Sequence, residues 1–240
     1  MIPVDLTAAY ELVRKGKVRD DRELLHASDL TACHRATWLR LRGAPELPMP
    51  DSSLDKFVIG HAIEQYIASF LSLQASTVNL ILTHGRRIVT GVHPHIVGHI
   101  DFDLTDLDGH ILAVIDATTT SWKSAEAKWS HKLKTAFYAR SVGAPHFAEW
   151  IFVLGHGGVI TEARAFWFKT ADFAEELMQL ETELLDVAAS RVMPPAIPPD
   201  NLGYNPCGKP GSGKSYCQSF CASNAALTVE DIRNSMEMEF

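Results

Sequence analysis

Two short apolar runs in the middle of the chain constrain the fold more than any other feature. They are "IVGHIDFDL", residues 96–104, and "HILAVIDAT", residues 110–118, and the turn sequence "TDLDG" joins them. Each run has the length and the β-branched content of a strand, so the pair predicts a β-hairpin. Similar runs at 77–84 and 86–92 precede it. We therefore expect an antiparallel meander that enters the hydrophobic core.

Helical patterns lie on both sides of this meander. Apolar periodicity and end signals predict helices at 28–43, 54–73, 124–143 and 170–192. Ser28 and Thr170 are the expected N-caps, and Gly43 is the expected stop signal. Two more strands, at 149–155 and 161–169, follow the helix at 124–143, which should act as a crossover. This order predicts an α/β fold with a sheet wrapped by helices.

The composition is typical of one substantial domain. The chain has 240 residues, of which 46% are hydrophobic and 21% charged, enough for a single core. No stretch reaches the apolar length of a membrane span, and no signal-peptide pattern opens the chain, so we expect a cytoplasmic protein without a membrane partner. The net charge of -7 argues against non-specific coating of nucleic acid but leaves room for a local basic groove.

The cysteines indicate a metal centre. Cys33 lies on the inward face of the first predicted helix, and Cys207, Cys217 and Cys221 lie together in a polar loop. In a reducing compartment a disulfide is not expected. Two interpretations remain: the four cysteines hold a metal ion or an iron-sulfur cluster, or they are separate thiols in the core. The pair of C-x-x-C knuckles typical of zinc is absent from the sequence. Spacing does not choose between zinc and an iron-sulfur cluster.

The segment "GKPGSGKS", Gly208 to Ser215, matches the phosphate-binding loop of nucleotide hydrolases. Such a loop must follow a buried strand, because its backbone N–H groups and the next helix surround the phosphate. Here "VMPPAIPPDNLGYNP" precedes it, and its prolines exclude a central strand. A P-loop NTPase therefore remains only a remote alternative.

Two aspartates carry the strongest chemical signal. Asp101 in "GHIDFDL" and Asp116 in "AVIDATTT" can lie side by side at a strand end, and paired carboxylates bind hard divalent cations such as Mg²⁺. A turn or cap role is the alternative for an aspartate, and it is weaker for Asp116, which follows the buried run "ILAVI". Asp103 and Asp106 are assigned to the exposed turn. His61, taken alone, reads as a half-exposed helix histidine.

In combination these segments resemble a known family. "SDLTACHR", "GHAIEQ", "GHIDFDL", "VIDATTT", "KTAFYA" and the C-terminal cysteines occur in the order found in the RecB-type branch of the PD-(D/E)XK nucleases. Within that branch the chain is similar to the CRISPR-associated and phage-borne exonucleases that carry an iron-sulfur cluster. The resemblance covers about Ser28 to Cys221 and implies a restriction-endonuclease-like central mixed sheet flanked by helices.

The resemblance also implies roles for individual residues. His61, Asp101, Asp116 and the backbone carbonyl of Ala117 would hold Mg²⁺ or Mn²⁺. Tyr138 would belong to the family's Q-x-x-x-Y helix motif. The four cysteines named above would hold a 4Fe-4S cluster that joins the N- and C-terminal segments, 28–43 and 207–221. This gives one iron-sulfur nuclease domain at 1–225, with its core at about 54–191 and an acidic tail at 226–240.

The implied activity is metal-dependent DNA exonuclease chemistry in DNA processing or recombination. The expected substrate is single-stranded DNA, and the expected partners are recombination or CRISPR-adaptation proteins. The expected location is the cytoplasm, for a prokaryotic or phage-encoded protein. Cations and aromatic rings that could contact the strand are available. They are Arg35, Arg40, Arg86, Arg87, Lys123, Lys128, Lys132, Trp122 and Trp129.

The chain departs from the family pattern at two places. Thr118 stands where the catalytic lysine is expected, and Lys134 stands where the helix motif has glutamine. We interpret Lys134 as a migrated catalytic lysine; a solvated helix lysine is the alternative, and it would make the protein a catalytically degenerate DNA-binding or assembly module. The uneven spacing of Cys207, Cys217 and Cys221 leaves the type of cluster open.

Overall fold

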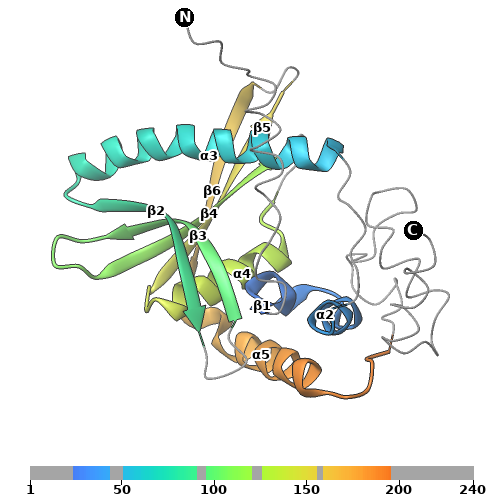
Figure 1. The fold of residues 1–240 in the computed structure, drawn as a ribbon. Helices are drawn as coiled ribbons and strands as arrows, with labels where there is room; N and C mark the ends of the chain where they lie inside the picture. The colour runs from blue at the N-terminus through green and yellow to red at the C-terminus, as the bar shows by residue number, and fades with distance from the viewer. Residues whose placement is uncertain (1–23, 44–50, 91–95, 121–125, 156–158, 196–240) are drawn as a thin grey trace, which may run out of the picture.

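The structure is a computed structural model that describes residues 24–43, 51–90, 96–120, 126–155 and 159–195. A mixed sheet of six strands lies at its centre, with helices on both faces (Figure 1). The strands are β1 (Leu25–His26), β2 (Ile81–Thr90), β3 (Ile96–Thr105), β4 (Ile111–Thr120), β5 (His146–Leu154) and β6 (Ile160–Lys169). The predicted α/β fold, a central mixed sheet flanked by helices, is confirmed.

Five helical elements of the described chain matter for the site. They are the 3₁₀-helix η1 (Ala27–Thr31) and the α-helices α2 (His34–Leu41), α3 (Asp51–Thr77), α4 (Trp129–Ser141) and α5 (Ala174–Ala189). A further 3₁₀ turn, η3 (Thr170–Phe173), leads into α5. The helix α3 lies on one face of the sheet, and α4 and α5 lie on the other (Figure 1).

The predicted meander and crossover are both present in the sheet. The strand order is β1-β3-β4-β5-β6, with β2 paired to β3. The pairs β2–β3, β3–β4 and β5–β6 are antiparallel. The pair β4–β5 is parallel, because the chain returns through α4 between these strands.

The strands β3 and β4 separate into a fork near their middles. Their pairing runs from Phe102 opposite Ile115 to Thr105 opposite Ile111. At the other end of β3, Ile96 and Val97 pair with β1 instead. Meanwhile β4 continues beyond Ile115 alongside β5. Backbone and side chains of residues 98–101 and 116–118 therefore border an opening between two strands.

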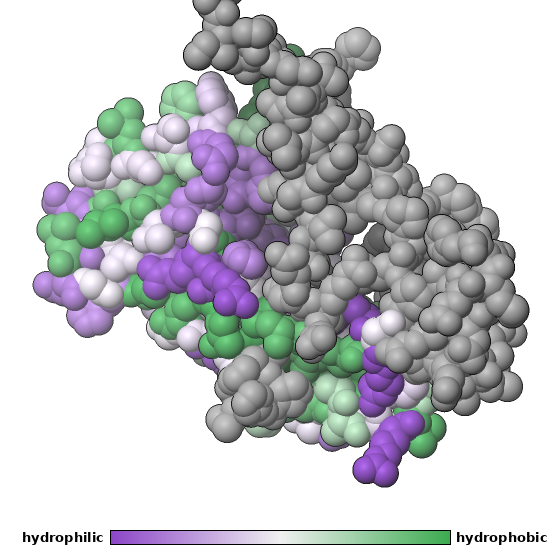
Figure 2. Space-filling model, viewed as in Figure 1, coloured by the Kyte–Doolittle hydropathy of each residue, from purple (hydrophilic) through white to green (hydrophobic). Residues whose placement is uncertain are grey.

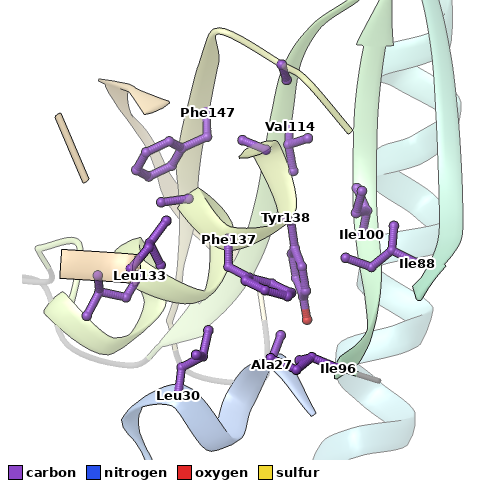
Figure 3. Packing of buried hydrophobic residues seen from close by; sticks show 14 of the residues in the cluster. Ala27, Leu30, Ile88, Ile96, Ile100, Val114, Leu133, Phe137, Tyr138 and Phe147 are labelled. Carbon is purple, nitrogen blue, oxygen red and sulfur yellow. The ribbon is translucent and has the colours of Figure 1, made fainter. Parts of the chain in front are cut away.

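Two hydrophobic clusters hold the layers together. On the α4 face, Phe137 and Tyr138 pack among residues of the sheet and of the N-terminal segment, including Leu30 and Val114 (Figure 3). On the α3 face, Ile67 packs on residues of β3, β4 and β5. Apolar burial on both faces fixes the central strands, so side chains at the fork have little freedom to move.

The end of α5 is tied to α2. The indole Nε1 of Trp38 donates a hydrogen bond to the carbonyl of Ser190 at 3.0 Å, and Arg42 donates to the same carbonyl. Cys33, which is buried, is the N-cap residue of α2. The chain thus leaves α5 beside the helix that follows Cys33.

Several predicted boundaries were wrong. The helix predicted at 28–43 is divided into η1 and α2, because Ala32 and Cys33 have extended backbones; Ser28 is therefore not its N-cap. Gly43 does end α2, with φ of 72°. Thr170 does not cap α5, because its hydroxyl donates to the carbonyl of Ala144 at 2.8 Å and a 3₁₀ turn intervenes.

Other elements differ in length from the prediction. The strands predicted at 77–84 and 86–92 are joined in one strand, β2, which covers 81–90 and continues through Gly85 with its φ of 72°, while 91–92 lie outside the described residues. The helix predicted at 54–73 extends over 51–77, and the one predicted at 124–143 covers 129–141. Within the described chain, no helix combines the length and the hydropathy that a membrane span requires. The face in Figure 2 mixes hydrophilic and hydrophobic side chains.

Candidate metal and catalytic site

The structure brings Asp101 and Asp116 together at the fork. Asp101 lies on β3 where the strand leaves β4, and its Oδ2 accepts a hydrogen bond from the backbone N–H of Ala117 at 2.8 Å. Asp116 lies on β4 and is 2% exposed. Side chains alternate along a strand, so Asp116 and Thr118 share the sheet face that α4 covers. Two carboxylates thus converge at one edge of the opening.

Lys134 reaches this pair from α4. Its Nζ lies 2.7 Å from Oδ1 of Asp116. Burial by itself would lower the pKa of Lys134, but the charge of Asp116 outweighs it and raises the pKa above its ordinary value. The ammonium therefore keeps its proton at any pH near neutrality. Lys134 thus contacts the Asp116 carboxylate and is not a fully solvated helix lysine. A lysine that replaces the one expected at residue 118 would need this position.

Tyr138 lies one turn further along the same face of α4. Its ring covers Gly98 of β3, where a Cβ would collide with the aromatic ring. Burial, opposed by the nearby Lys134, raises the pKa of Tyr138 to about 12. The phenol therefore stays protonated, and its hydroxyl interacts with the backbone of His99. Tyr138 fixes the distance between α4 and β3, and so helps to place Lys134.

The electrostatics of the fork fit a divalent cation. Burial and then the charge of Asp116 raise the pKa of Asp101 to about 8, although the Ala117 N–H and Lys134 act in the opposite direction. The raised pKa of Asp101 reflects burial first and the repulsion between two adjacent carboxylates second. A hard cation with oxygen ligands can replace the proton and relieve that repulsion. Asp101 and Asp116 therefore have the chemistry of a Mg²⁺ or Mn²⁺ site.

The sequence analysis missed Glu149. This residue lies on β5 directly beside Asp116 in the parallel register and is 1% exposed. Its Oε1 accepts a hydrogen bond from the hydroxyl of Thr135 at 2.5 Å. Burial, and next the charge of Asp116, raise the pKa of Glu149 to about 8. A glutamate inside the apolar strand "HFAEWIFVL" was the available signal, since a buried charge in a strand is expensive.

His131 belongs to a second group of possible metal ligands, together with Asp116 and Glu149. Its Nδ1 lies 3.2 Å from the hydroxyl of Thr118 and 3.8 Å from Oε2 of Glu149. Burial lowers the pKa of His131. Ligand atoms of Asp116, His131 and Glu149 all lie within 4.8 Å of one another, close enough to hold a metal ion. The threonine in the expected lysine position thus contacts a histidine of α4.

His61 contacts a carboxylate of its own helix, and among the described residues it forms no metal-holding group with Asp101 and Asp116. Its Nδ1 lies 3.2 Å from Oε2 of Glu64, one turn further along α3. The other carboxylate oxygen of Glu64 lies 2.8 Å from Nε2 of His84 on β2. Glu64 adds negative charge to the surroundings of Asp101. From the sequence, His61 was proposed as a ligand, and neither Glu64, one turn away, nor His84 was given a role.

The structure corrects the assignment of one aspartate. Asp103 was expected in the exposed turn, but it is fully buried, and its carboxylate pairs with Arg86 at 2.8 Å between Oδ2 and Nε. The reason is its position in the sheet, where Asp103 is paired with Thr83 of β2 on one side and Val114 of β4 on the other. Asp106 does lie in the turn, where it accepts hydrogen bonds from the backbone N–H groups of Asp108 and His110.

Three of the proposed DNA-contacting cations are engaged within the protein. Arg86 pairs with Asp103, Arg40 pairs with Asp29 at 2.5 Å, and Arg35 is buried. Arg87, Lys128 and Trp129 remain exposed, and Lys132 lies 5.3 Å from the ring centre of Phe168. The predicted positions that lie outside the described residues are Cys207, Cys217, Cys221, Gly208–Ser215, Trp122, Lys123 and the tail 226–240.

Comparison with known proteins shows similarity at the level of the fold. No family model and no curated protein matches the chain. The crystal structure of SSO0001 is similar with a TM-score of 0.57 and 11% identity, over 95% of this chain and 100% of that one. An alkaline exonuclease, LHK-Exo from Laribacter hongkongensis, aligns with a TM-score of 0.49 and 12% identity, over 75% of this chain and 91% of that one. At these identities the first similarity concerns the fold alone, and the second carries no argument.

Proposed function

We propose that the protein is a divalent-metal-dependent deoxyribonuclease. The observation that carries the proposal is the fork itself, where Asp101 and Asp116 converge and Lys134 contacts Asp116 at 2.7 Å. A pair of carboxylates with a charged ammonium beside it suits a reaction in which a phosphodiester gains negative charge. The motif order in the sequence supports the same chemistry.

The metal ligands in this proposal are His61, Asp101, Asp116 and the carbonyl of Ala117. A bound Mg²⁺ or Mn²⁺ would supply the Lewis acidity that phosphodiester hydrolysis requires. The protein's own contribution is to hold the two carboxylates at the fork and to keep Lys134 protonated beside them. In hydrolysis, a water oxygen forms a bond to phosphorus while the bond from phosphorus to one ester oxygen breaks.

In this proposal Lys134 replaces the catalytic lysine that the motif has at the position of Thr118. Thr118 shares a sheet face with Asp116, so a lysine there would reach the same carboxylate from β4. Lys134 reaches it from α4 instead, and its raised pKa keeps the charge in place. A preorganised cation at this point can stabilise the charge that develops on the scissile phosphate.

The four-cysteine cluster remains part of the proposal. Cys33 is buried at the start of α2, and Trp38 of the same helix binds Ser190 at the end of α5. The 16 residues between Ser190 and Cys207 could extend over roughly 50 Å, so chain length does not limit the approach of the two segments. We propose a 4Fe-4S cluster held by Cys33, Cys207, Cys217 and Cys221 within one domain at 1–225.

The proposed substrate is DNA, with single strands attacked from an end during DNA processing or recombination. Arg87, Lys128 and Trp129 are exposed and could contact such a strand. A second candidate is a catalytically degenerate DNA-binding or assembly module. The observation that favours it is Thr118, whose hydroxyl contacts His131 in place of the expected ammonium.

A cleavage assay separates these two functions. Protein purified without oxygen is incubated with end-labelled single- and double-stranded DNA, with Mg²⁺, with Mn²⁺ or with chelator. We expect metal-dependent shortening of the DNA by the parent and none by Asp116→Ala. DNA binding without cleavage under every metal condition, with an intact cluster, would establish the degenerate module instead.

A further inference from the structure

The strongest feature that the proposed function uses only in part is a group of three side chains, Asp116, His131 and Glu149. They come from three elements, β4, α4 and β5. One ligand atom of each, a carboxylate oxygen or a ring nitrogen, lies within 4.8 Å of those of the other two. The group lies between the sheet and α4, because Asp116 and Glu149 are neighbours in the parallel register and both contact side chains of that helix.

The two carboxylates of this group are buried side by side. Asp116 is 2% exposed and Glu149 is 1% exposed, and their strands are neighbours within the sheet. Like charges at close range repel, and a buried carboxylate needs a compensating partner. Lys134 supplies one ammonium, at 2.7 Å from Oδ1 of Asp116. Because a carboxylate has two oxygens and several lone pairs, Asp116 can keep this contact and also bind a metal ion.

Glu149 has one carboxylate oxygen that is not engaged in a hydrogen bond. Its Oε1 accepts a hydrogen bond from the hydroxyl of Thr135. Within the described chain its Oε2 has no such bond, and the ion-pair contact of this oxygen is Nδ1 of His131, at 3.8 Å. Polar atoms of buried side chains are nearly always hydrogen-bonded or bound to an ion. An oxygen of this kind, directed at a histidine, therefore indicates a ligand that binds between the two side chains.

The spacing of the group suits one metal ion. Bonds from a divalent transition metal to nitrogen and oxygen are about 2.1 Å long, which places neighbouring ligand atoms about 3.0–3.4 Å apart and opposite ones about 4.2 Å apart. The 3.8 Å between Nδ1 of His131 and Oε2 of Glu149 lies within this range. The His131 side chain is 32% exposed, so its ring has room for a small adjustment and ions can reach the group from solvent.

The ligand types favour a transition metal over Mg²⁺. An imidazole nitrogen suits Zn²⁺ and related ions, carboxylates suit Mn²⁺, and Mg²⁺ prefers oxygen ligands alone. The pair Asp101 and Asp116 at the fork, in contrast, offers side-chain oxygens only. Three protein ligands also leave coordination positions for water or for a phosphate oxygen.

From these contacts we infer that Asp116, His131 and Glu149 bind a second divalent cation, Mn²⁺ or Zn²⁺, between the sheet and α4. The inference goes beyond the proposed function, in which neither His131 nor Glu149 has a part. Asp116 belongs to both sites, so its loss should remove both ions, whereas Asp101 belongs to the fork alone.

The number of bound Mn²⁺ ions tests the inference without DNA. Mn²⁺ is the suitable probe because thiolates bind it poorly, so the cysteines do not interfere. The full-length protein is titrated with Mn²⁺, and the free ion is measured by electron paramagnetic resonance. We expect two ions in the parent, one in each of Glu149→Gln, His131→Ala and Asp101→Asn, and none in Asp116→Ala. The affinity of the lost site should fall by more than about 100-fold, since losing even a supporting partner of a ligand costs 10- to 100-fold.

Glu149→Gln is the most informative variant, because its amide keeps the shape of the side chain and an oxygen for the Thr135 hydroxyl. The matched control is His110→Ala. With Asp106 and Asp108, His110 forms the other group of this spacing in the described chain, but in a turn where Asp106 already accepts two backbone hydrogen bonds. We expect this variant to bind as many Mn²⁺ ions as the parent.

Anomalous diffraction from Mn²⁺-soaked crystals of the parent gives a second readout, which does not depend on how any variant folds. We expect one peak at bonding distance from both His131 and Glu149. Soaked crystals that show no such peak would overturn the inference.

The outcomes also separate this site from the proposed function. A single Mn²⁺ ion in the parent, retained in both Glu149→Gln and His131→Ala, would disprove the second site and leave the fork standing. A single ion that is lost in Glu149→Gln and kept in Asp101→Asn would support the second site and count against the fork. A parent that binds both ions but never cleaves DNA would disprove the nuclease and leave the second site confirmed.

Discussion

Lys134 and Thr118 are the residues at which this chain differs most from the pattern that its sequence resembles. The ammonium of Lys134 contacts Asp116 from α4, and the hydroxyl of Thr118 contacts His131. A cation beside Asp116 is thus retained, although it comes from another element. The lysine can be moved back to residue 118 by mutation, which tests the role of each of the two side chains.

Lys134→Gln should slow DNA cleavage by about 100-fold, the scale for removing one preorganised charge from a developing anion. Adding Thr118→Lys to this variant should recover a large part of the rate, because residue 118 shares the sheet face of Asp116. Single-turnover rates on end-labelled DNA at saturating Mn²⁺ measure both effects. Lys132→Ala is the control, since Lys132 lies against Phe168. Parent-like cleavage by Lys134→Gln would show that the migrated lysine has no catalytic part.

At the scale of elements, the site depends on how closely α4 approaches β3. Gly98 permits this approach because the Tyr138 ring occupies the space of a side chain. Tyr138 lies in the core cluster, between residues of the sheet and of the N-terminal segment (Figure 3). Any side chain at residue 98 must therefore displace α4 or distort the strand.

Gly98→Ala should lower the free energy of unfolding by about 1–3 kcal/mol, the usual cost of overpacking a core. Urea unfolding followed by circular dichroism measures this change. Gly60→Ala is the matched control: a Cβ at Gly60 meets nothing within 4 Å, and alanine in a helix should stabilise by about 0.5–1 kcal/mol. Combining Gly98→Ala with Tyr138→Leu should remove much of the cost. An unchanged stability in Gly98→Ala would contradict the close packing of α4 on β3.

The sequence predicted the elements that have strong local signals. The hairpin that carries Asp101 and Asp116 was found because both strands have apolar runs around a turn sequence. Asp103 was misplaced because sequence proximity to the turn hid its burial and its pairing with Arg86 from another strand. Glu149 and His131 were missed because their roles arise from the register of β5 and from the packing of α4 on the sheet, neither of which is a local property.

For the whole molecule, the raised pKa values of two carboxyl groups, Asp101 and Glu149, should make the free energy of unfolding depend on pH. The pKa values of Asp101 and Glu149 are raised to about 8, mainly by burial, whereas unfolded carboxyl groups titrate near pH 4. Between these values the folded protein holds more protons than the unfolded chain. The metal-free protein should therefore lose stability as the pH rises from about 5 to about 9.

We expect the melting temperature of metal-free protein to fall over this pH range, and to fall less in Asp101→Asn, which has no carboxylate to ionise. Mn²⁺ should raise the melting temperature more at pH 8 than at pH 5, because the cation competes with protons for the same oxygens. Differential scanning calorimetry measures both trends. An Asp101→Asn variant with the same pH dependence as the parent would contradict the assignment of buried, protonated carboxyl groups.

The position of a bound Mn²⁺ ion decides whether the fork is a metal site. Crystals of the protein are soaked in Mn²⁺, and anomalous diffraction locates the metal without reference to any assay. We expect a peak at the fork, with oxygen ligands from Asp101 and Asp116 at the distances of a hard divalent cation, and no such peak in crystals of Asp116→Ala. Strong anomalous peaks elsewhere with none between these two carboxylates would contradict it.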